Sequence, residues 1–308
     1  MRSVKLLLLL LCLSVSNIAQ TTPSPEPKTL LSLWTAPTPR LKAKTTFAPK
    51  PTTGNNIFKA DGEKWLSDAV IKLEAGVLRP VNDPEVSDYV SAVGKNLVAY
   101  SADPKLSYEF VVLDVGEENA MCLGSGRVYI NLGMLKAVEN EDELAGILAH
   151  EIGHNAFGHL PKTVTRQLFW MKGITKVKTA AEAESSLYAL NKAYQKNEFA
   201  SFGEQLLGWG RNDELQADKA GFYNMYKAGY NPEYMKNFLR RDIRQSKEEL
   251  GVDYDGMQFL IFLLGDHPPS SQRLTALKWE SNWIKMPPKD EHYKNAAFDA
   301  MKIRVSKL

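Results

Sequence analysis

The spacing of apolar residues predicts helices along most of the chain after residue 57. Apolar positions three and four residues apart predict helices at 64–78 and 83–100. The pattern then changes to short runs rich in β-branched and aromatic residues, at 106–115 and 127–131, with a Gly-Ser-Gly turn before the second run. Helical spacing returns afterwards. We therefore expect an α+β fold that is mainly helical and contains a small β-sheet.

The best-defined helix is expected at 140–160, directly after the predicted sheet. Asn140 is a candidate N-cap, and Glu143 stands at the position that completes a capping box. Gly158 is a candidate stop signal near the other end. One stripe of this helix is apolar and should pack into a core; it comprises Leu144, Ile147 and Leu148.

The polar face of this helix carries the motif H-E-x-x-H, formed by His150, Glu151 and His154. Residues four apart share one face of a helix, so the two imidazoles can bind one metal ion while Glu151 points toward a metal-bound water. This arrangement is typical of zinc hydrolases. The alternative is that the histidines are solvated residues near a helix C-terminus, where positive charge is favourable.

A catalytic zinc ion takes three protein ligands and keeps one position open, so the motif needs a third ligand. His159 lies nine residues after His150 and would point away from it on a continuous helix, so we interpret it as a supporting or structural residue. Glu214 and Asp218 stand four residues apart in NDELQADKAG and would share one helical face. We expect Glu214 to bind the ion and Asp218 to accept a hydrogen bond from the other ring nitrogen of a ligating histidine. The sequence thus predicts one Zn²⁺ per chain.

Composition places the chain among globular proteins. It has 308 residues, 44% of them hydrophobic and 24% charged, which is enough apolar material for one sizeable domain. The net charge is +2, and basic residues are interleaved with acidic ones rather than clustered. Nothing in this charge pattern favours nucleic acid as a partner.

The N-terminal stretch at 1–19 has the pattern of a secretory signal peptide, with a basic start, an apolar run at 6–15 and a small residue at its end. The competing interpretation is a retained membrane anchor, but this run is well short of the roughly 20 apolar residues that span a bilayer. Residues 20–56 are rich in Thr, Pro and Lys and are expected to form a disordered linker. An apolar patch within it could dock on the domain or on a partner, although a patch without such a role is the favoured interpretation; it comprises Leu30, Leu31, Leu33 and Trp34. The folded domain is then expected at 57–308.

Cysteine usage is compatible with export. Cys12 lies in the leader, and Cys122 alone cannot form an internal disulfide bond. The absence of an N-x-S/T sequon favours a bacterial envelope over eukaryotic secretion. We therefore expect an exported protein, periplasmic or extracellular, with no transmembrane span.

Several aromatic and apolar residues leave peripheral contact with a membrane surface open. They could make such contact or line a hydrophobic groove, although packing in the core is the favoured interpretation; they include Phe169, Trp170, Met171, Phe202, Leu206 and Trp209. The sequence assigns no oligomeric state.

Five segments occur in unbroken order between about residues 83 and 277 and resemble the CAAX prenyl protease and HtpX-like family of gluzincin metallopeptidases. They are EENAMCLGSGRVYINLGML, NEDELAGILAHEIGHNAFGH, NDELQADKAG, AGYNP and DHPPSSQRL. The resemblance implies a zinc-dependent endopeptidase with a mainly helical, zincin-like fold and a small sheet beside the H-E-x-x-H helix. By motif position it implies zinc ligands at His150, His154 and Glu214, a general base at Glu151 and a helical companion at Asp218.

The same resemblance gives roles to two residues near the end of the match. His267 would stabilise the oxyanion or, in a latent form, cap the zinc, and Arg273 would support that region. Many membrane members of the family carry several transmembrane helices, and envelope relatives often continue into tetratricopeptide repeats. We expect neither here, so the substrate is not assigned from those relatives.

A peptide substrate could bind by adding a strand to an exposed edge of the small sheet. The candidate edge strand comprises Arg127, Val128, Tyr129, Ile130 and Asn131. The alternative is an ordinary strand without a substrate role.

We hypothesise a zinc-dependent endopeptidase that hydrolyses peptide bonds in exported or envelope proteins, including misfolded ones, through a zinc-bound water activated by Glu151. His267 would donate a hydrogen bond to the oxyanion. A hypothesis of a different class is a non-proteolytic, chaperone-like binder of unfolded envelope proteins with a latent zinc site.

Overall fold

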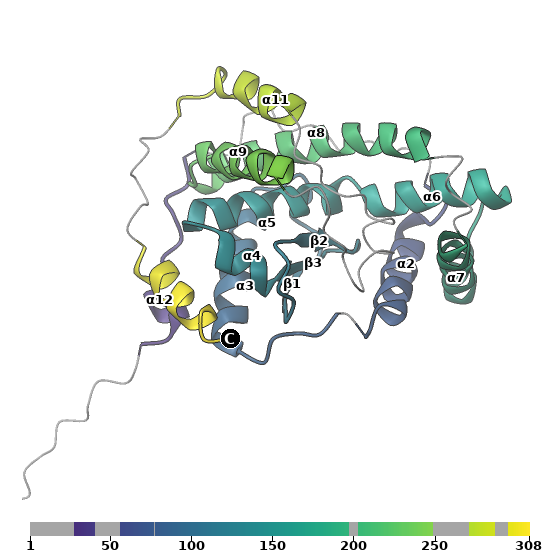
Figure 1. Ribbon diagram of the computed structural model, residues 1–308, viewed down its shortest axis with the longest axis horizontal. Helices are drawn as coiled ribbons and strands as arrows, with labels where there is room; N and C mark the ends of the chain where they lie inside the picture. The colour runs from purple at the N-terminus through teal and green to yellow at the C-terminus, as the bar shows by residue number, and fades with distance from the viewer. Residues whose placement is uncertain (1–27, 41–55, 77, 197–202, 249–270, 287–294) are drawn as a thin grey trace, which may run out of the picture.

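The computed structural model describes residues 28–40, 56–76, 78–196, 203–248, 271–286 and 295–308 (Figure 1). The strands of its sheet are β1 (Glu109–Leu113), β2 (Ala120–Cys122) and β3 (Arg127–Asn131). The helices among these residues are α1 (Leu30–Leu33), α2 (Lys59–Leu73), α3 (Pro84–Val98), α4 (Leu132–Ala137), α5 (Glu141–Ala156), α6 (His159–Lys172), α7 (Ala180–Gln195), α8 (Gly203–Ala228), α9 (Glu233–Glu248), α11 (Ser271–Ser281) and α12 (Ala296–Val305). The mainly helical α+β fold that the sequence predicts is confirmed.

Helix α5 lies at the centre of the fold. Figure 1 shows α8 and α9 on one side of it, and the sheet and α3 on the other. Its N-terminus is capped as predicted, because the Asn140 side chain accepts a hydrogen bond of 2.9 Å from the backbone N–H of Glu143. Every residue of α5 is buried. Its polar side chains must therefore find partners inside the protein.

The sheet has the order β1-β3-β2, with β1 parallel and β2 antiparallel to β3. Arg127–Asn131 is therefore the central strand, and the expectation that it forms an exposed edge is wrong. The chain crosses from β1 to the far side of the sheet and forms β2 before a hairpin brings β3 into the middle. Among the described residues, the edges belong to β1 and β2. Strand β2 escaped prediction because three residues are too few to show the two-residue period of a strand.

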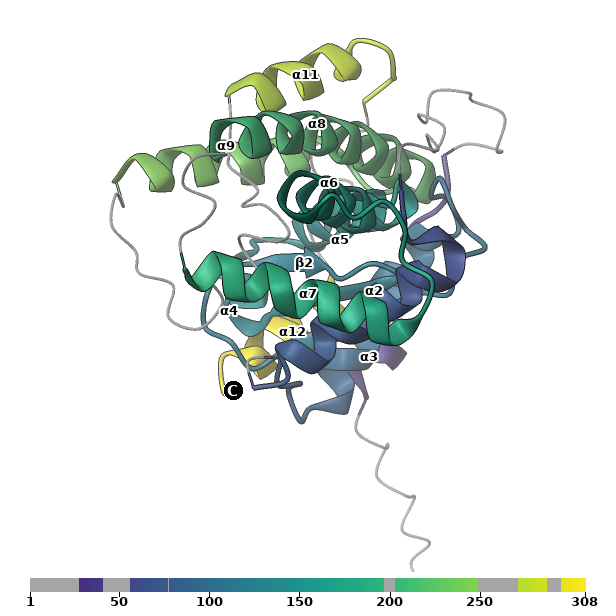
Figure 2. The ribbon, with the colours of Figure 1, turned by 90° about the vertical axis from the view of Figure 1, so that its right-hand side faces the viewer.

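Alternate residues of the sheet pack into two hydrophobic cores. Phe110, Val112 and Val128 face the core that is built with α3, α5 and α8. Met121 and Tyr129 face a second core, to which α2, α6 and α7 contribute. Figure 2 shows α7 beside α2 on this side of the molecule. The sheet therefore links the central helix to the α2–α7 pair.

Residues 28–40 pack on the domain, although the sequence places them in the expected linker. Leu30 of α1 is buried, and its backbone N–H donates to Glu85 of α3 at 3.1 Å. The Trp34 indole donates to Glu141, the first residue of α5, at 3.2 Å. A short apolar run can order itself in this way when a folded domain offers it a complementary surface.

None of the helices in the described ranges is both long and apolar enough to cross a membrane.

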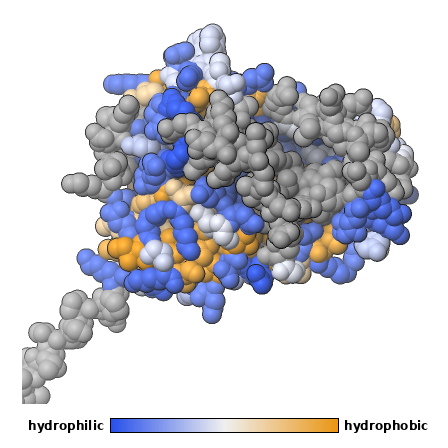
Figure 3. Space-filling view, in the orientation of Figure 1, coloured by the Kyte–Doolittle hydropathy of each residue, from blue (hydrophilic) through white to orange (hydrophobic). Residues whose placement is uncertain are grey.

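Phe169 and Trp170 of α6 are 52% and 51% exposed, so core packing is the wrong interpretation for these two residues. Figure 3 shows another hydrophobic area, in the lower half of the face seen in Figure 1, with hydrophilic residues around it.

Candidate metal centre

Helices α5 and α8 bring three ligand groups together. His150 and His154 come from α5 and Glu214 from α8, and one ligand atom of each lies within 4.8 Å of the other two. The Nε2 atoms of the two histidines are 2.9 Å apart. Glu214 Oε2 lies 3.3 Å from His150 Nε2, and Glu214 Oε1 lies 3.2 Å from His154 Nε2. All three side chains are buried.

Glycines allow α5 and α8 to approach this closely. A Cβ atom on Gly153 would lie 3.1 Å from Cα of Ala217, and one on Gly221 would lie 3.1 Å from the backbone N of His150. These neighbours are backbone atoms, which cannot rotate away as the end of a side chain can. The absence of a side chain at both positions therefore brings Glu214 within reach of the histidines.

The geometry of the three groups fits a zinc ion. Tetrahedral ligands at about 2.0–2.1 Å from zinc lie about 3.3 Å from one another. The two Nε2 atoms are 2.9 Å apart, and each has a different oxygen of Glu214 nearby, Oε2 at 3.3 Å from His150 and Oε1 at 3.2 Å from His154, so either carboxylate oxygen can face an ion between the rings. Two imidazoles and one carboxylate form a ligand set that catalytic zinc sites use, and it leaves a fourth position for water or substrate.

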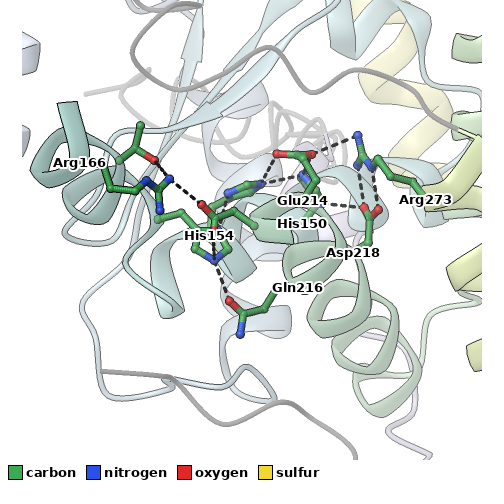
Figure 4. A network of polar contacts seen from close by, with 10 residues as sticks. His150, His154, Arg166, Glu214, Gln216, Asp218 and Arg273 are labelled. Atoms are coloured by element: carbon green, nitrogen blue, oxygen red, sulfur yellow. Dashed lines mark hydrogen bonds and ion pairs between the residues drawn. The ribbon is translucent and has the colours of Figure 1, made fainter. Parts of the chain in front are cut away.

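The second ring nitrogen of His150 faces Asp218. His150 Nδ1 lies 3.0 Å from Asp218 Oδ1, so it can donate its hydrogen there and leave the Nε2 lone pair for a metal. Arg273 donates two hydrogen bonds of 2.7 Å to Asp218, and its Nη1 lies 3.2 Å from Glu214 Oε2. Figure 4 shows Arg273 and Asp218 beside His150 and Glu214. The structure thus brings to the site Asp218 and Arg273, two of the residues expected to support it.

These charges favour a cation in the site. Burial lowers the pKa of His150, but the Glu214 and Asp218 carboxylates outweigh burial and raise this pKa to about 10. Burial raises the pKa of Asp218, but the charge of Arg273 and the hydrogen bonds from Arg273 and His150 lower it to about 2. Asp218 therefore stays ionised, and the negative potential that favours a proton on His150 also favours a divalent cation.

His159 lies beside His154, so the expectation that it points away is wrong. Helix α5 ends at Ala156, Gly158 adopts a left-handed backbone with a φ of 61°, and α6 begins at His159. This break in the helix turns the chain and brings His159 Nδ1 to 2.8 Å from His154 Nδ1. Burial first, and then the neighbouring His154, lower the pKa of His159 to about 3.

Three polar residues around His159 carried no recognisable signal in the sequence. Gln216 Oε1 lies 3.0 Å from His159 Nε2, and Asp213 Oδ1 lies 3.6 Å from the same nitrogen. Arg166 donates to Asp213 at 3.1 Å. Figure 4 shows the network extending from Arg166 past the histidines to Arg273. The i, i+3 spacing of Asp213 and Gln216 indicates a shared helical face, but their partner belongs to α6, which no local pattern identifies.

Glu151 is buried on α5, next to His150 in the chain. Burial, and then the charge of Glu151, raise the pKa of Cys122, the last residue of β2. The candidate general base therefore lies near an edge strand of the sheet.

His267 lies outside the described residues, so its role stays a prediction.

Comparison with known proteins agrees with these motifs. The model of Peptidase family M48 matches residues 84–281, a range that contains all three candidate ligands.

Several proteases are similar to this chain. It is 23% identical over 202 residues to the beta-barrel assembly-enhancing protease of Escherichia coli (strain K12), which covers 64% of this chain and 40% of that protein. It is 30% identical over 192 residues to the mitochondrial metalloendopeptidase OMA1 of Schizosaccharomyces pombe, which covers 62% of this chain and 51% of that protein. It is 23% identical over 237 residues to the metalloprotease LoiP of Escherichia coli (strain K12). This match covers 72% of this chain and 83% of that protein. The match thus spans only 40% of the length of the beta-barrel assembly-enhancing protease.

Proposed function

This chain belongs to peptidase family M48, whose members are metal-dependent peptidases, and we propose that it is a zinc endopeptidase with one Zn²⁺ per chain. The observation that carries the proposal is the buried cluster of His150, His154 and Glu214, with its donor atoms within 4.8 Å of one another. The ligand set of two imidazoles and one carboxylate supports the choice of metal.

The proposed roles follow from the position of each side chain. His150, His154 and Glu214 hold the ion, and Asp218 keeps His150 in the tautomer that binds through Nε2. Zinc supplies Lewis acidity, which polarises the peptide carbonyl and lowers the pKa of water. Glu151 removes a proton from the attacking water and passes it to the leaving amine.

We assign to His267 the role of hydrogen-bond donor to the developing oxyanion. Support comes from Arg273, six residues further along the same motif, whose Nη1 lies 3.2 Å from Glu214 Oε2. His267 is thus six residues in sequence from a side chain that contacts the proposed ligand Glu214. One donor of this kind contributes about 3 kcal/mol to transition-state stabilisation.

The proposed substrates are exported or envelope proteins, including misfolded ones. The secretory pattern at 1–19 supports export to the periplasm or outside the cell, and the relative named for beta-barrel assembly supports an envelope setting. An extended segment of such a substrate could pair with β2, the edge strand near Glu151. This strand replaces β3 as the candidate for substrate alignment.

Digestion of casein tests the proposal. The zinc-loaded full chain should cut casein at internal bonds, and mass spectrometry should detect the new N-termini. The variant Glu151→Gln should keep its zinc but lose roughly 10²–10⁴-fold in rate. Cleavage at the wild-type rate in this variant would remove Glu151 from the mechanism. A wild type that suppresses aggregation of unfolded proteins but leaves casein intact would favour the chaperone-like alternative.

A further inference from the structure

The two histidines of the ligand cluster are held by chemically different partners. His150 Nδ1 faces a carboxylate oxygen, that of Asp218, at 3.0 Å. His154 Nδ1 instead faces a ring nitrogen, Nδ1 of His159, at 2.8 Å. A carboxylate can only accept a hydrogen bond, so it fixes the His150 tautomer by itself. A neutral imidazole nitrogen can be donor or acceptor, so the contact with His159 does not fix His154 unless something else fixes His159.

Gln216 is the group that can fix His159. A hydrogen bond between the two Nδ1 atoms holds one hydrogen, which belongs either to His154 or to His159. On its other side, His159 Nε2 lies 3.0 Å from the carbonyl oxygen Oε1 of Gln216, which can only accept. The hydrogen of neutral His159 is therefore on Nε2, and its Nδ1 carries the lone pair. Consequently His154 donates from Nδ1, and its own Nε2 lone pair points at the ligand cluster.

If these hydrogen bonds ran in the reverse direction, His154 could not bind a metal through Nε2. If the Gln216 amide were turned so that its NH₂ group donated to His159, then His159 Nδ1 would donate to His154. Neutral His154 would then carry its hydrogen on Nε2, the atom that lies 3.2 Å from Glu214 Oε1. Asp213 favours the first direction, because its Oδ1 lies 3.6 Å from His159 Nε2 and its other oxygen accepts from Arg166 at 3.1 Å.

We propose that Gln216 and His159 form a hydrogen-bond relay that sets the tautomer of His154 and so prepares its Nε2 to bind the metal. The two residues are positioning residues, and the inference rests on the proposed function in that it takes His154 as a zinc ligand. His159 is 4% exposed, so bulk water cannot readily replace it as the acceptor for His154. The chain turns at Gly158, so that α6 begins with His159. This turn places the acceptor, Nδ1 of His159, beside the C-terminal end of α5.

Two substitutions separate an acceptor role from a packing role. In His159→Asn, the side-chain oxygen takes roughly the place of Nδ1 and can still accept from His154. In His159→Leu, the volume is closer to that of histidine, but the acceptor is lost. The relay predicts zinc binding weaker by roughly 10–100-fold in His159→Leu and close to wild type in His159→Asn. A packing role predicts the opposite order, because Asn fills less space than Leu.

The experiment measures zinc affinity of the full chain by competition with a chelator, for the wild type and both variants, with circular dichroism to confirm folding. Ring-nitrogen NMR of the metal-free full chain supplies a readout that needs no zinc. The chain has five histidines, so assignment by substitution is practical. We expect His154 to carry its hydrogen on Nδ1 and His159 on Nε2 in the wild type. The variant Gln216→Met, whose thioether sulfur is a much weaker acceptor than the amide oxygen, should weaken this preference at His159.

The relay is overturned if wild-type His154 carries its hydrogen on Nε2, or if His159→Leu binds zinc as tightly as the wild type. A wild type that binds no zinc would instead contradict the proposed function. In that case the ring-nitrogen spectrum would still decide which tautomers the relay sets.

Discussion

The carboxylate of Glu214 lies 3.2 Å from Nε2 of His154, although Glu214 belongs to α8 and His154 to α5. The candidate metal centre therefore depends on how closely these two helices pack. Gly153 is at the point of closest approach, because a Cβ atom there would lie 3.1 Å from both Cα and O of Ala217.

We predict that Gly153→Ala destabilises the protein and weakens metal binding. Replacing Gly by Ala inside a helix stabilises it by about 0.5–1 kcal/mol. Overpacking a tight core contact costs about 1–3 kcal/mol, so overpacking should win by roughly 1 kcal/mol. Urea unfolding of the metal-free chain measures the difference.

The matched control is Gly210→Ala in α8, where a Cβ atom would meet nothing within 4 Å. This variant should be as stable as the wild type or slightly more stable. Equal gains in stability from both substitutions would show that α5 and α8 do not need the close approach.

Removing the charge of Glu214 should release the metal. Glu214→Gln keeps the shape of the side chain but offers a neutral and weaker ligand, so zinc affinity should fall by more than the roughly 10–100-fold typical of residues that only orient a ligand. Metal analysis after dialysis against a chelator measures this. Full zinc content in this variant would mean that Glu214 is not a ligand.

Asp218 should affect both metal binding and stability. Asp218→Asn gives His150 a neutral partner and leaves the buried guanidinium of Arg273 without its bidentate carboxylate. We predict zinc binding weaker by roughly 10–100-fold and a loss of about 3 kcal/mol in the free energy of unfolding.

An exposed ion pair provides the comparison for Asp218. Lys72 and Glu184 lie 2.5 Å apart but are 69% and 52% exposed, so Glu184→Gln should change stability little. If Asp218→Asn is as harmless as Glu184→Gln, the ion pair with Arg273 does not stabilise the site.

Glu141, the first residue of α5, should give stability an unusual dependence on pH. It is buried and accepts hydrogen bonds from the Tyr89 hydroxyl at 2.5 Å and the Trp34 indole at 3.2 Å. Burial raises the pKa of Glu141 from 4.5 to about 7. Between these values the folded protein binds more protons at this residue than the unfolded chain does. Its contribution to stability therefore falls as the pH rises through this range.

We predict that Glu141→Gln lacks this pH-dependent contribution to stability. Relative to the wild type, the variant should gain stability as the pH is raised from about 4.5 to about 7, and the difference should level off above that. Urea unfolding at a series of pH values measures it, and Glu139→Gln is the control because the Glu139 side chain is 66% exposed. Parallel pH profiles for Glu141→Gln and the wild type would contradict the prediction.

Local geometry made part of the site predictable from the sequence. His150 and His154 are four residues apart on a strongly signalled helix, so their shared face follows from helical periodicity alone. Glu214 is different, because its approach depends on packing between α5 and α8. The need for a third ligand, its four-residue spacing to Asp218 and the resemblance to a metallopeptidase family indicate Glu214, but none of them supplies the packing. The structure brings these three residues together.

The errors also have physical causes. A continuous helix predicts that His159 points away from His150, whereas the left-handed residue Gly158 breaks the helix. The sequence does not reveal that β3 is the central strand, because β2 is too short to be recognised and pairing order is a property of the whole sheet. Composition alone predicts a linker at residues 28–40, because their contacts are to distant parts of the chain, which composition does not reveal.

Crystallographic localisation of the metal tests the central claim most directly. Anomalous scattering at the zinc edge should show one peak in crystals of the zinc-loaded full chain. We predict that it lies about 2.0–2.2 Å from Nε2 of His150, Nε2 of His154 and a carboxylate oxygen of Glu214. A peak at any other place, or a peak at the histidines with Glu214 turned away from it, would contradict the claim.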